Sequence, residues 1–254
     1  MIENSLKRKL EAGEVTIGPF VNCSYPAFTE ILGLAGFDFC ILDMEHGPLH
    51  TLVLEDLARA AQGVGLAPIV RVRKNDGPQI QRALDIGSAG VQVPQIETAE
   101  EAQSVVQGAK YNPIGKRGLS YYLRAADYGA GGVEGVLDTI NKEQLVIVHV
   151  EGIQGIENLD SVVSVPNIDV IFLGPYDLSQ SLGIPGMVSD PRVTKLMETA
   201  SSKIRAAGKF VGTFADNPET AKRWAGLGVQ YIALGVDVQI FLHACQEIVD
   251  KVRN

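Results

Sequence analysis

The feature that most constrains the fold is a regular alternation of two kinds of segment along the chain. Eight short runs rich in aliphatic and β-branched residues are each followed by a longer stretch with helical spacing of its apolar positions. The runs are residues 15–22, 37–45, 67–73, 90–96, 145–151, 168–174, 209–214 and 229–235. Eight such pairs in 254 residues predict one α/β domain, residues 1–254, folded as a (β/α)8 TIM barrel.

The stretches between the runs support this reading. Helices are expected, for example, at residues 51–65, 77–87, 98–110 and 189–208. One connection, residues 111–132, is much longer and is rich in glycine and tyrosine. A loop of this length inside a compact domain is usually functional, so we expect a lid or an interface segment there. A surface insertion is the alternative.

Charge and cysteine content limit the partners and the compartment. The formal net charge is -8 with no long run of one sign, which argues against a nucleic-acid binder. The three cysteines Cys23, Cys40 and Cys245 are far apart, which predicts reduced thiols and a cytoplasmic location. The N-terminal residues lack the apolar core of a signal peptide. No apolar run approaches the ~20 residues of a membrane span, so no membrane partner is expected.

Polar side chains gather where the expected strands end, which is where a TIM barrel places its active site. They are Asp43, Glu45 and His46 in the second run, Arg71 and Arg73 in the third, His149 and Glu151 in the fifth, and Asp177 just after the sixth. The starts of the runs are mostly apolar or small. The active site is therefore expected at one rim, mostly on the second to sixth strands.

Two of these residues suit a hard divalent cation. Glu151 and Asp177 follow neighbouring strands, and Mg²⁺ or Mn²⁺ is usually held by one or two carboxylates plus waters and substrate. For Glu151 the alternative is a salt bridge to a rim arginine. For Asp177 it is the N-cap of the following helix.

Two other rim residues suit acid–base and anion chemistry. His46 is a candidate general base, or else a rim histidine bonded to a loop. Arg71 ends an apolar strand, so its guanidinium needs an anion, which could be a substrate carboxylate, an enolate oxygen or a rim aspartate. No lysine occupies the place that a Schiff-base aldolase requires, because Lys209 starts its run and Lys74 lies past the end of one. If the barrel makes or breaks carbon–carbon bonds, a metal is therefore expected to supply the electron sink.

Six motifs occur in an order that resembles the HpcH/HpaI aldolase family. They are DMEHG at 43–47, PIVRVR at 68–73, VQVPQIET at 91–98, YNPIGKRG at 111–118, VEG at 150–152 and GPYDLS at 174–179. The family consists of metal-dependent aldolases that cleave 4-hydroxy-2-keto acids to pyruvate and an aldehyde through a pyruvate enolate. The resemblance spans essentially the whole chain and implies Mg²⁺ or Mn²⁺ as cofactor, with Co²⁺ a further candidate.

The resemblance also implies roles for individual residues. His46 matches the general base, Arg71 the arginine that stabilises the enolate, and Glu151 and Asp177 the metal ligands. Asp85, in RALDIG, matches an aspartate that raises the basicity of the histidine and that can come from a neighbouring subunit.

Further family features concern the turns and the assembly. Asp43, at the start of DMEHG, is expected among the catalytic groups because it ends the second run at the same rim. The turn that begins at Gly174 is expected to offer backbone N–H groups to the pyruvate carboxylate. Family members are typically hexamers of paired trimers, often with the C-terminal helix exchanged between subunits, so a homohexamer is expected.

The chain departs from the family pattern at two positions. His149 stands where the family usually has a glutamine that touches the pyruvyl group, and Tyr176 stands where it usually has a small residue. Both residues are expected to bind substrate, and both affect the choice of substrate more than the chemistry. Two alternatives stay open: a CoA-linked lyase of the citrate lyase β type, and a barrel that binds a keto acid without turnover. The short chain and His46 argue against the first.

Overall fold

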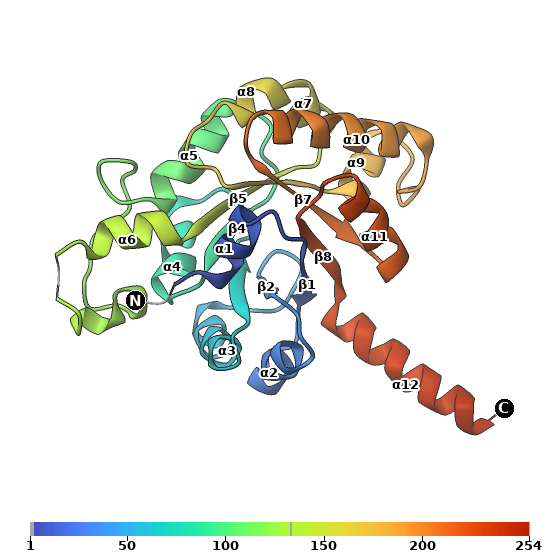
Figure 1. Ribbon diagram of the computed structural model, residues 1–254, viewed down its shortest axis with the longest axis horizontal. Coiled ribbons are helices and arrows are strands. Elements are labelled where there is room, and N and C mark those ends of the chain that lie inside the picture. The colour runs from blue at the N-terminus through green and yellow to red at the C-terminus, as the bar shows by residue number, and fades with distance from the viewer. Residues whose placement is uncertain (1–2, 133, 254) are drawn as a thin grey trace.

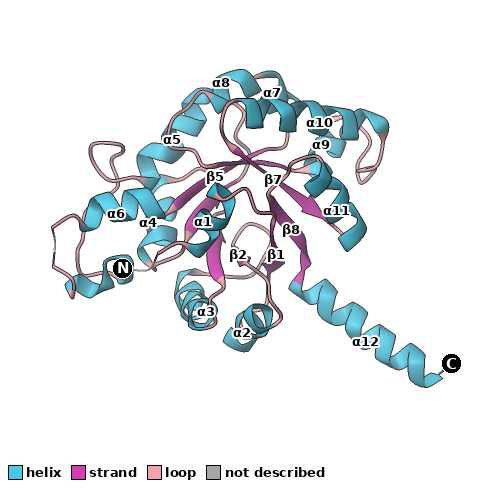
Figure 2. Cartoon of the chain, viewed as in Figure 1, coloured by secondary structure: helices cyan, strands magenta, loops and turns pink. Residues whose placement is uncertain are grey.

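The structure is a computed structural model that describes residues 3–132 and 134–253. Eight parallel strands form a closed barrel in chain order, and helices surround it (Figures 1 and 2). The strands are β1 Thr16–Val21, β2 Phe39–Asp43, β3 Ala67–Arg71, β4 Gly90–Val93, β5 Leu145–Val150, β6 Val170–Leu173, β7 Phe210–Ala215 and β8 Tyr231–Val236. Each lies in a predicted run or passes its end by one residue, so the TIM-barrel prediction is confirmed.

The helices follow the strands as predicted. They are α1 Ser5–Glu11, α2 Pro26–Leu34, α3 Thr51–Gly63, α4 Gly77–Asp85, α5 Ala99–Ala109, α6 Val136–Glu143, α7 Ile153–Glu157, α8 Leu159–Val163, α9 Pro175–Ser181, α10 Pro191–Ala206, α11 Pro218–Gly226 and α12 Asp237–Arg253. Local sequence fixes their starts. The Asp76 side chain accepts the Gln79 N–H at the start of α4, and Thr98 forms a capping box with Glu101 at the start of α5.

The two faces of each strand build two separate apolar layers. In β5, Val146, Val148 and Val150 pack between the barrel and the helices. Leu145 and Ile147 belong to a second cluster that fills the lumen. Because side chains alternate along a strand, His149 shares the lumen phase of Leu145 and Ile147. The sequence pattern therefore placed His149 on the correct face.

Helix α1 closes the amino end of the barrel, a role that the polar N-terminal sequence did not reveal. Leu6 and Leu10 are buried and join the lumen cluster that contains Phe39 and Tyr231. Asn4 fixes the helix in place by donating to the carbonyl oxygens of Ala89 and Glu143, each at 2.8 Å. The lumen is thus sealed below, and its polar groups can meet solvent only at the carboxyl end.

The long segment after α5 does not cover the carboxyl end of its own barrel. It contains a 3₁₀ turn, η1 Arg124–Gly129. The Arg124 guanidinium donates to the Ile86 carbonyl and to Gln62, and the Tyr128 hydroxyl accepts from Arg59. These contacts lie where α3 and α4 end, beside the amino ends of β3 and β4. The expectation of a lid over the same subunit is therefore wrong, and the interface role stays a prediction.

The C-terminal helix α12 extends away from the barrel (Figure 1). Phe241, Ile248 and Val252 are apolar side chains that it leaves exposed. In the described part of the chain, no helix combines the length and the apolar character that crossing a membrane requires.

The close approach of β1 and β2 depends on Gly18. A Cβ atom there would lie 2.0 Å from the Phe39 carbonyl oxygen, which belongs to the backbone and cannot swing aside. We expect Gly18→Ala to lower the free energy of unfolding by about 3 kcal/mol, measured by urea denaturation. Gly63→Ala is the matched control, because a Cβ there meets nothing within 4 Å at the end of α3. It should raise stability by about 0.5–1 kcal/mol. Equal effects of both variants would contradict this account.

Candidate active site

The carboxyl ends of β2 and β3 hold a buried ion pair. Asp43 and Arg71 are register partners as the last residues of these strands. The Arg71 Nε lies 2.8 Å from Asp43 Oδ1 and its Nη2 lies 2.7 Å from Oδ2, in a bidentate contact. Its Nη1 forms an ion pair with Glu45 Oε2 at 3.0 Å, and its guanidinium lies 4.4 Å from the centre of the Phe20 ring. Arg71 thus has a rim aspartate as partner, one of the predicted alternatives.

Asp43 also shapes the turn that carries His46. Its Oδ1 accepts the backbone N–H of Glu45 at 2.9 Å as well as the Arg71 Nε–H. The His46 side chain is 69% exposed, and its Nε2 lies 4.0 Å from the Glu45 carboxylate. Among the residues that the structure describes, the His46 side chain therefore has no partner closer than the Glu45 carboxylate, and the backbone of the turn sets its position. Its role as a base stays a prediction.

Glu151 follows β5 at the same rim and is 9% exposed. Its Oε2 lies 2.9 Å from His149 Nδ1, and its Oε1 accepts the Gln95 N–H at 2.9 Å. The alternative that Glu151 pairs with a rim arginine is wrong, because its partner is His149. Burial opposes ionisation of this carboxyl, but the contact with the His149 ring and the Gln95 N–H hold the pKa of Glu151 below its ordinary value.

Asp177 lies in the first turn of α9, close enough to Glu151 for the two carboxylates to interact electrostatically. The N-cap of α9 is Gly174, so the alternative that Asp177 caps this helix is wrong. Within the described residues, the Asp177 carboxylate has no hydrogen bond or ion pair. Partial burial raises the pKa of Asp177, and the charge of Glu151 raises it further. Gly174 makes room here, since a Cβ on it would lie 2.8 Å from Glu151 Oε2.

These carboxylates suit a cation for which the protein supplies only some of the ligands. Among the described residues, no three His, Cys, Asp or Glu side chains converge as a complete metal site. Burial and the charge of Glu151 also raise the pKa of Glu45, although Arg71 opposes that rise. Carboxylates that disfavour one another's ionisation are what a cation would relieve. Two carboxylates with open positions suit Mg²⁺ or Mn²⁺, which keep waters or substrate as further ligands.

The two residues that depart from the family pattern are both engaged within the protein. His149 is 1% exposed, and its Nε2 lies 2.5 Å from the amide nitrogen of Gln92. Tyr176 is half-exposed and donates to Asp216 Oδ1 at 2.7 Å, after β7. Partial burial and the Asp216 carboxylate raise the pKa of Tyr176 to about 12, so this hydroxyl stays protonated. A contact of either residue with substrate stays a prediction.

Asp85 lies at the opposite end of the barrel from His46 within one subunit. It is the last residue of α4, which returns the chain to the amino end. Its Oδ1 accepts from the fully buried Arg117 guanidinium, with Nη2 at 2.6 Å. Asp85 can therefore reach a His46 only in a neighbouring subunit, as the resemblance allowed.

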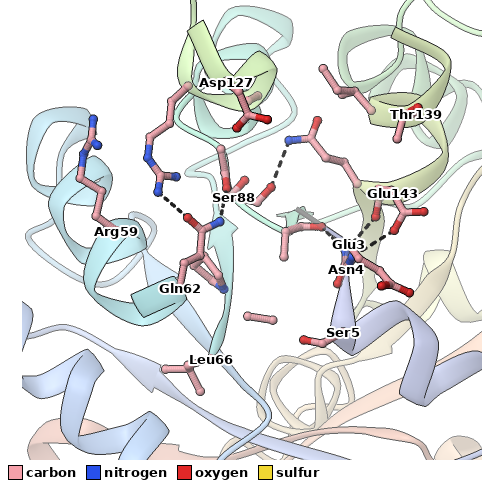
Figure 3. A pocket seen from close by; sticks show the side chains of 18 of the residues that line it. Glu3, Asn4, Ser5, Arg59, Gln62, Leu66, Ser88, Asp127, Thr139 and Glu143 are labelled. Carbon is pink, nitrogen blue, oxygen red and sulfur yellow. Dashed lines mark hydrogen bonds between the residues drawn. The ribbon is translucent and has the colours of Figure 1, made fainter. Parts of the chain in front are cut away.

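A cavity of about 490 Å³ also lies at the amino end, away from these carboxylates. Figure 3 shows Arg59, Gln62 and Asp127 on one side of it and Glu3, Asn4 and Glu143 on the other. Its polar groups largely bond one another, for example Gln62 with Arg124 and Asn4 with Glu143. The cavity and the predicted rim site are separate.

Sequence reasoning missed two polar residues inside the lumen. The hydroxyl of Tyr231 donates to Oε1 of Gln92 at 3.0 Å, and the amide of Gln92 meets His149. A signal was available for Gln92, which is a polar residue between two valines of a buried run. Tyr231 gave no such signal, because tyrosine is common in strands.

Comparison with known proteins places these features in a family context. A model of the HpcH/HpaI aldolase/citrate lyase family matches residues 16–244. The chain is 34% identical over 248 residues to the 2-keto-3-deoxy-L-rhamnonate aldolase of Escherichia coli (strain K12), covering 97% of this chain and 92% of the relative. It is 37% identical over 251 residues to the 5-keto-4-deoxy-D-glucarate aldolase of Shigella dysenteriae serotype 1, covering 99% and 97%.

One solved structure extends the likeness to three dimensions. An HpcH/HpaI aldolase/citrate lyase family protein from Burkholderia cenocepacia J2315 superposes with a TM-score of 0.93 at 31% identity, covering 99% of this chain and 100% of that one. The similarity therefore includes the whole barrel and the segments that carry the rim residues.

The buried ion pair yields a prediction about stability. Arg71→Met leaves Asp43 and Glu45 buried without their cation, which should lower the free energy of unfolding by about 3–5 kcal/mol near neutral pH. Loss of Arg71 raises the pKa of Glu45 further above its unfolded value, because Arg71 is what opposes the effect of burial. That penalty applies above the folded pKa and is removed as protonation becomes complete, so the deficit should shrink from about pH 7 to about pH 4.

The measurement is urea denaturation of both proteins across this pH range. Arg73→Met is the matched control, because Arg73 is exposed and, among the residues that the structure describes, donates only to the carbonyl oxygens of Met44 and Leu49. It should cost less than about 1 kcal/mol at every pH. A deficit for Arg71→Met that stays constant with pH would show that Asp43 and Glu45 do not depend on it.

Proposed function

The chain belongs to the HpcH/HpaI aldolase/citrate lyase family and is an aldolase, and we propose that it uses a divalent metal to cleave 4-hydroxy-2-keto acids to pyruvate and an aldehyde. The observation that carries the proposal is the pair of rim carboxylates beside a buried arginine. Asp177 has no partner among the described residues, and partial burial raises its pKa, which the negative charge of Glu151 raises further. None of the eight strands, all of which are described, contains a lysine that could form a Schiff base.

Glu151 and Asp177 would hold the metal, which would be Mg²⁺, Mn²⁺ or Co²⁺. When bound, such a metal acts as a Lewis acid that stabilises the negative charge of the pyruvate enolate. The Gln95 N–H and the His149 ring contact the two oxygens of Glu151, which would orient this carboxylate for a cation. Gly174 lets the turn before α9 approach this carboxylate, where the backbone N–H groups would face the pyruvate carboxylate.

Arg71 and His46 would act on the substrate. The bidentate contact with Asp43 fixes the plane of the Arg71 guanidinium, and Nη1 and Nη2 each carry a second hydrogen. Those hydrogens would bind the developing oxyanion of the keto acid. His46 would take the proton from the C4 hydroxyl as the C3–C4 bond breaks, and its exposure leaves the imidazole open to substrate. Asp85 of an adjacent subunit would orient it.

The relatives suggest a substrate class. They are named for a keto-deoxy rhamnonate and a keto-deoxy glucarate, so we propose a keto-deoxy sugar acid as substrate here. The Tyr176–Asp216 pair lies beside the metal carboxylate Asp177 and would contact the aldehyde half. A CoA-linked lyase and a barrel without turnover are the less favoured readings, because the relatives are free-acid aldolases by name.

We also propose a cytoplasmic homohexamer with an exchanged C-terminal helix. The exposed Phe241, Ile248 and Val252 on α12 support exchange, because a partner would bury them. The three cysteines are unpaired, which is the usual state in a reducing compartment.

Metal-dependent pyruvate release tests the function. With Mg²⁺, Mn²⁺ or Co²⁺, the protein should release pyruvate from a panel of 4-hydroxy-2-keto acids that includes keto-deoxy sugar acids. Glu151→Gln and Asp177→Asn should each reduce kcat/KM by about 100-fold or more, because each removes a charged ligand. Asp160→Asn is the control, since that aspartate forms an exposed ion pair with Lys203 and should leave activity unchanged.

Two outcomes would contradict the proposal. Full activity after thorough chelation would exclude a metal-dependent reaction. No pyruvate release from any free acid, with metal bound, would leave the CoA-linked lyase or the barrel without turnover.

A further inference from the structure

A single line of hydrogen-bonded side chains runs through the barrel lumen to the proposed metal site. It starts at Tyr231, the first residue of β8, and passes through Gln92 of β4 and His149 of β5 to Glu151. The Tyr231 hydroxyl lies 3.0 Å from Gln92 Oε1, and Gln92 Nε2 lies 2.5 Å from His149 Nε2. His149 Nδ1 lies 2.9 Å from Glu151 Oε2.

These side chains are enclosed, so their polar groups must form hydrogen bonds with one another. Tyr231 and Gln92 are fully buried, and His149 is 1% exposed. Phe172 stacks on the His149 ring with centroids 4.4 Å apart, and Phe39 stacks on Tyr231 at 4.2 Å. Gly212 leaves space for these rings, because a Cβ on it would lie 2.9 Å from Phe172 and 3.0 Å from Tyr231. Aromatic packing therefore holds the polar groups in a fixed geometry.

The carboxylate end favours one of the two ring nitrogens of His149 as the carrier of the hydrogen. An ionised carboxylate only accepts hydrogen bonds, so the contact with Glu151 favours a hydrogen on His149 Nδ1. In a neutral imidazole the other nitrogen is then an acceptor. His149 Nε2 consequently needs a donor, and the nearby amide nitrogen of Gln92 is one.

The tyrosine end determines which way the Gln92 amide faces. Its Oε1 must face Tyr231 if the hydroxyl is to donate, and that orientation turns Nε2 toward His149. Within the described residues, the Tyr231 hydroxyl has no other hydrogen-bond partner. If the amide were reversed, Gln92 Nε2 would donate to the Tyr231 oxygen, and the hydroxyl hydrogen of Tyr231 would have no acceptor. An unpaired buried donor costs about 1–3 kcal/mol. Both ends therefore favour the same arrangement, in which Gln92 Nε2 donates to His149 Nε2 and His149 Nδ1 donates to Glu151.

We propose that Tyr231 is a positioning residue that sets the direction of this line and so keeps His149 in the Nδ1–H tautomer, as a donor to Glu151. The Gln95 N–H fixes Oε1 and the His149 N–H fixes Oε2, so both oxygens of the carboxylate are oriented before a cation binds. A residue at the foot of β8 thereby controls a ligand at the opposite end of the barrel. The consequence for metal binding rests on the proposed function, whereas the tautomer does not.

Nitrogen NMR of the metal-free protein tests the tautomer. The chain has four histidines, so ¹⁵N-histidine labelling gives few signals, and His149→Gln identifies those of His149. Near neutral pH, Nδ1 should carry the hydrogen and Nε2 should not. In Tyr231→Phe, the Nε2 signal should move toward the protonated position, because the amide is free to reverse. Tyr111→Phe is the matched control, since the Tyr111 hydroxyl is buried and has no hydrogen-bond partner in the described part of the chain, and it should leave both signals in place.

Mn²⁺ titration of the same proteins measures the effect on the carboxylate. Tyr231→Phe should bind Mn²⁺ about 10-fold more weakly than wild type, and Tyr111→Phe should bind equally well. A protonated Nε2 in the wild type would overturn the proposal, and that measurement needs no variant to fold. Unchanged signals in folded Tyr231→Phe would also overturn it. Wild-type protein that shows the expected tautomer but does not bind Mn²⁺ would instead contradict the proposed function.

Discussion

The interior of a closed barrel is dry, and this constraint governs the polar side chains that lie in the lumen. Helix α1 seals the amino end with Leu6 and Leu10, so a polar side chain in the lumen must find its partner inside or reach the carboxyl rim. Arg71 pairs with Asp43 and Glu45. His149 contacts Gln92 on the lumen side and Glu151 on the rim side. Both sets of contacts end at the rim, where the site is open to solvent.

Charge balance explains why the rim suits a catalytic cation. Arg71 neutralises one of the carboxylates around it, yet Glu45, Glu151 and Asp177 still share a small region. Glu151 is the most buried of the three, yet its contacts with His149 and Gln95 keep its pKa low. Its negative charge in turn raises the pKa of Glu45 and Asp177. A divalent cation would remove this conflict, and the same positive charge would stabilise an enolate. Repulsion among these carboxylates and the Lewis acidity proposed for the site would thus have one origin.

Much of the fold and part of the site could be predicted from the sequence. The alternation of runs determined the eight strands, and the two-residue period put His149 and Glu151 on one face. Local patterns could not show that Asp43 clamps Arg71, because that contact depends on the register of β2 against β3. Local patterns also could not show that α1 closes the barrel or that residues 111–132 lie at the amino end. Both placements depend on tertiary contacts between segments that are far apart in the sequence.

The lumen network gives a physical meaning to the departure at position 149. A glutamine, which the family resemblance leads one to expect there, and a histidine differ in size and charge, but both can direct an N–H group at the neighbouring carboxylate. A glutamine amide always retains an N–H donor, whereas a neutral imidazole has one donor nitrogen and one acceptor nitrogen. Histidine at this position therefore needs an additional group that determines which nitrogen donates. Gln92 and Tyr231 supply that group, and Gly212 provides the space that Tyr231 needs.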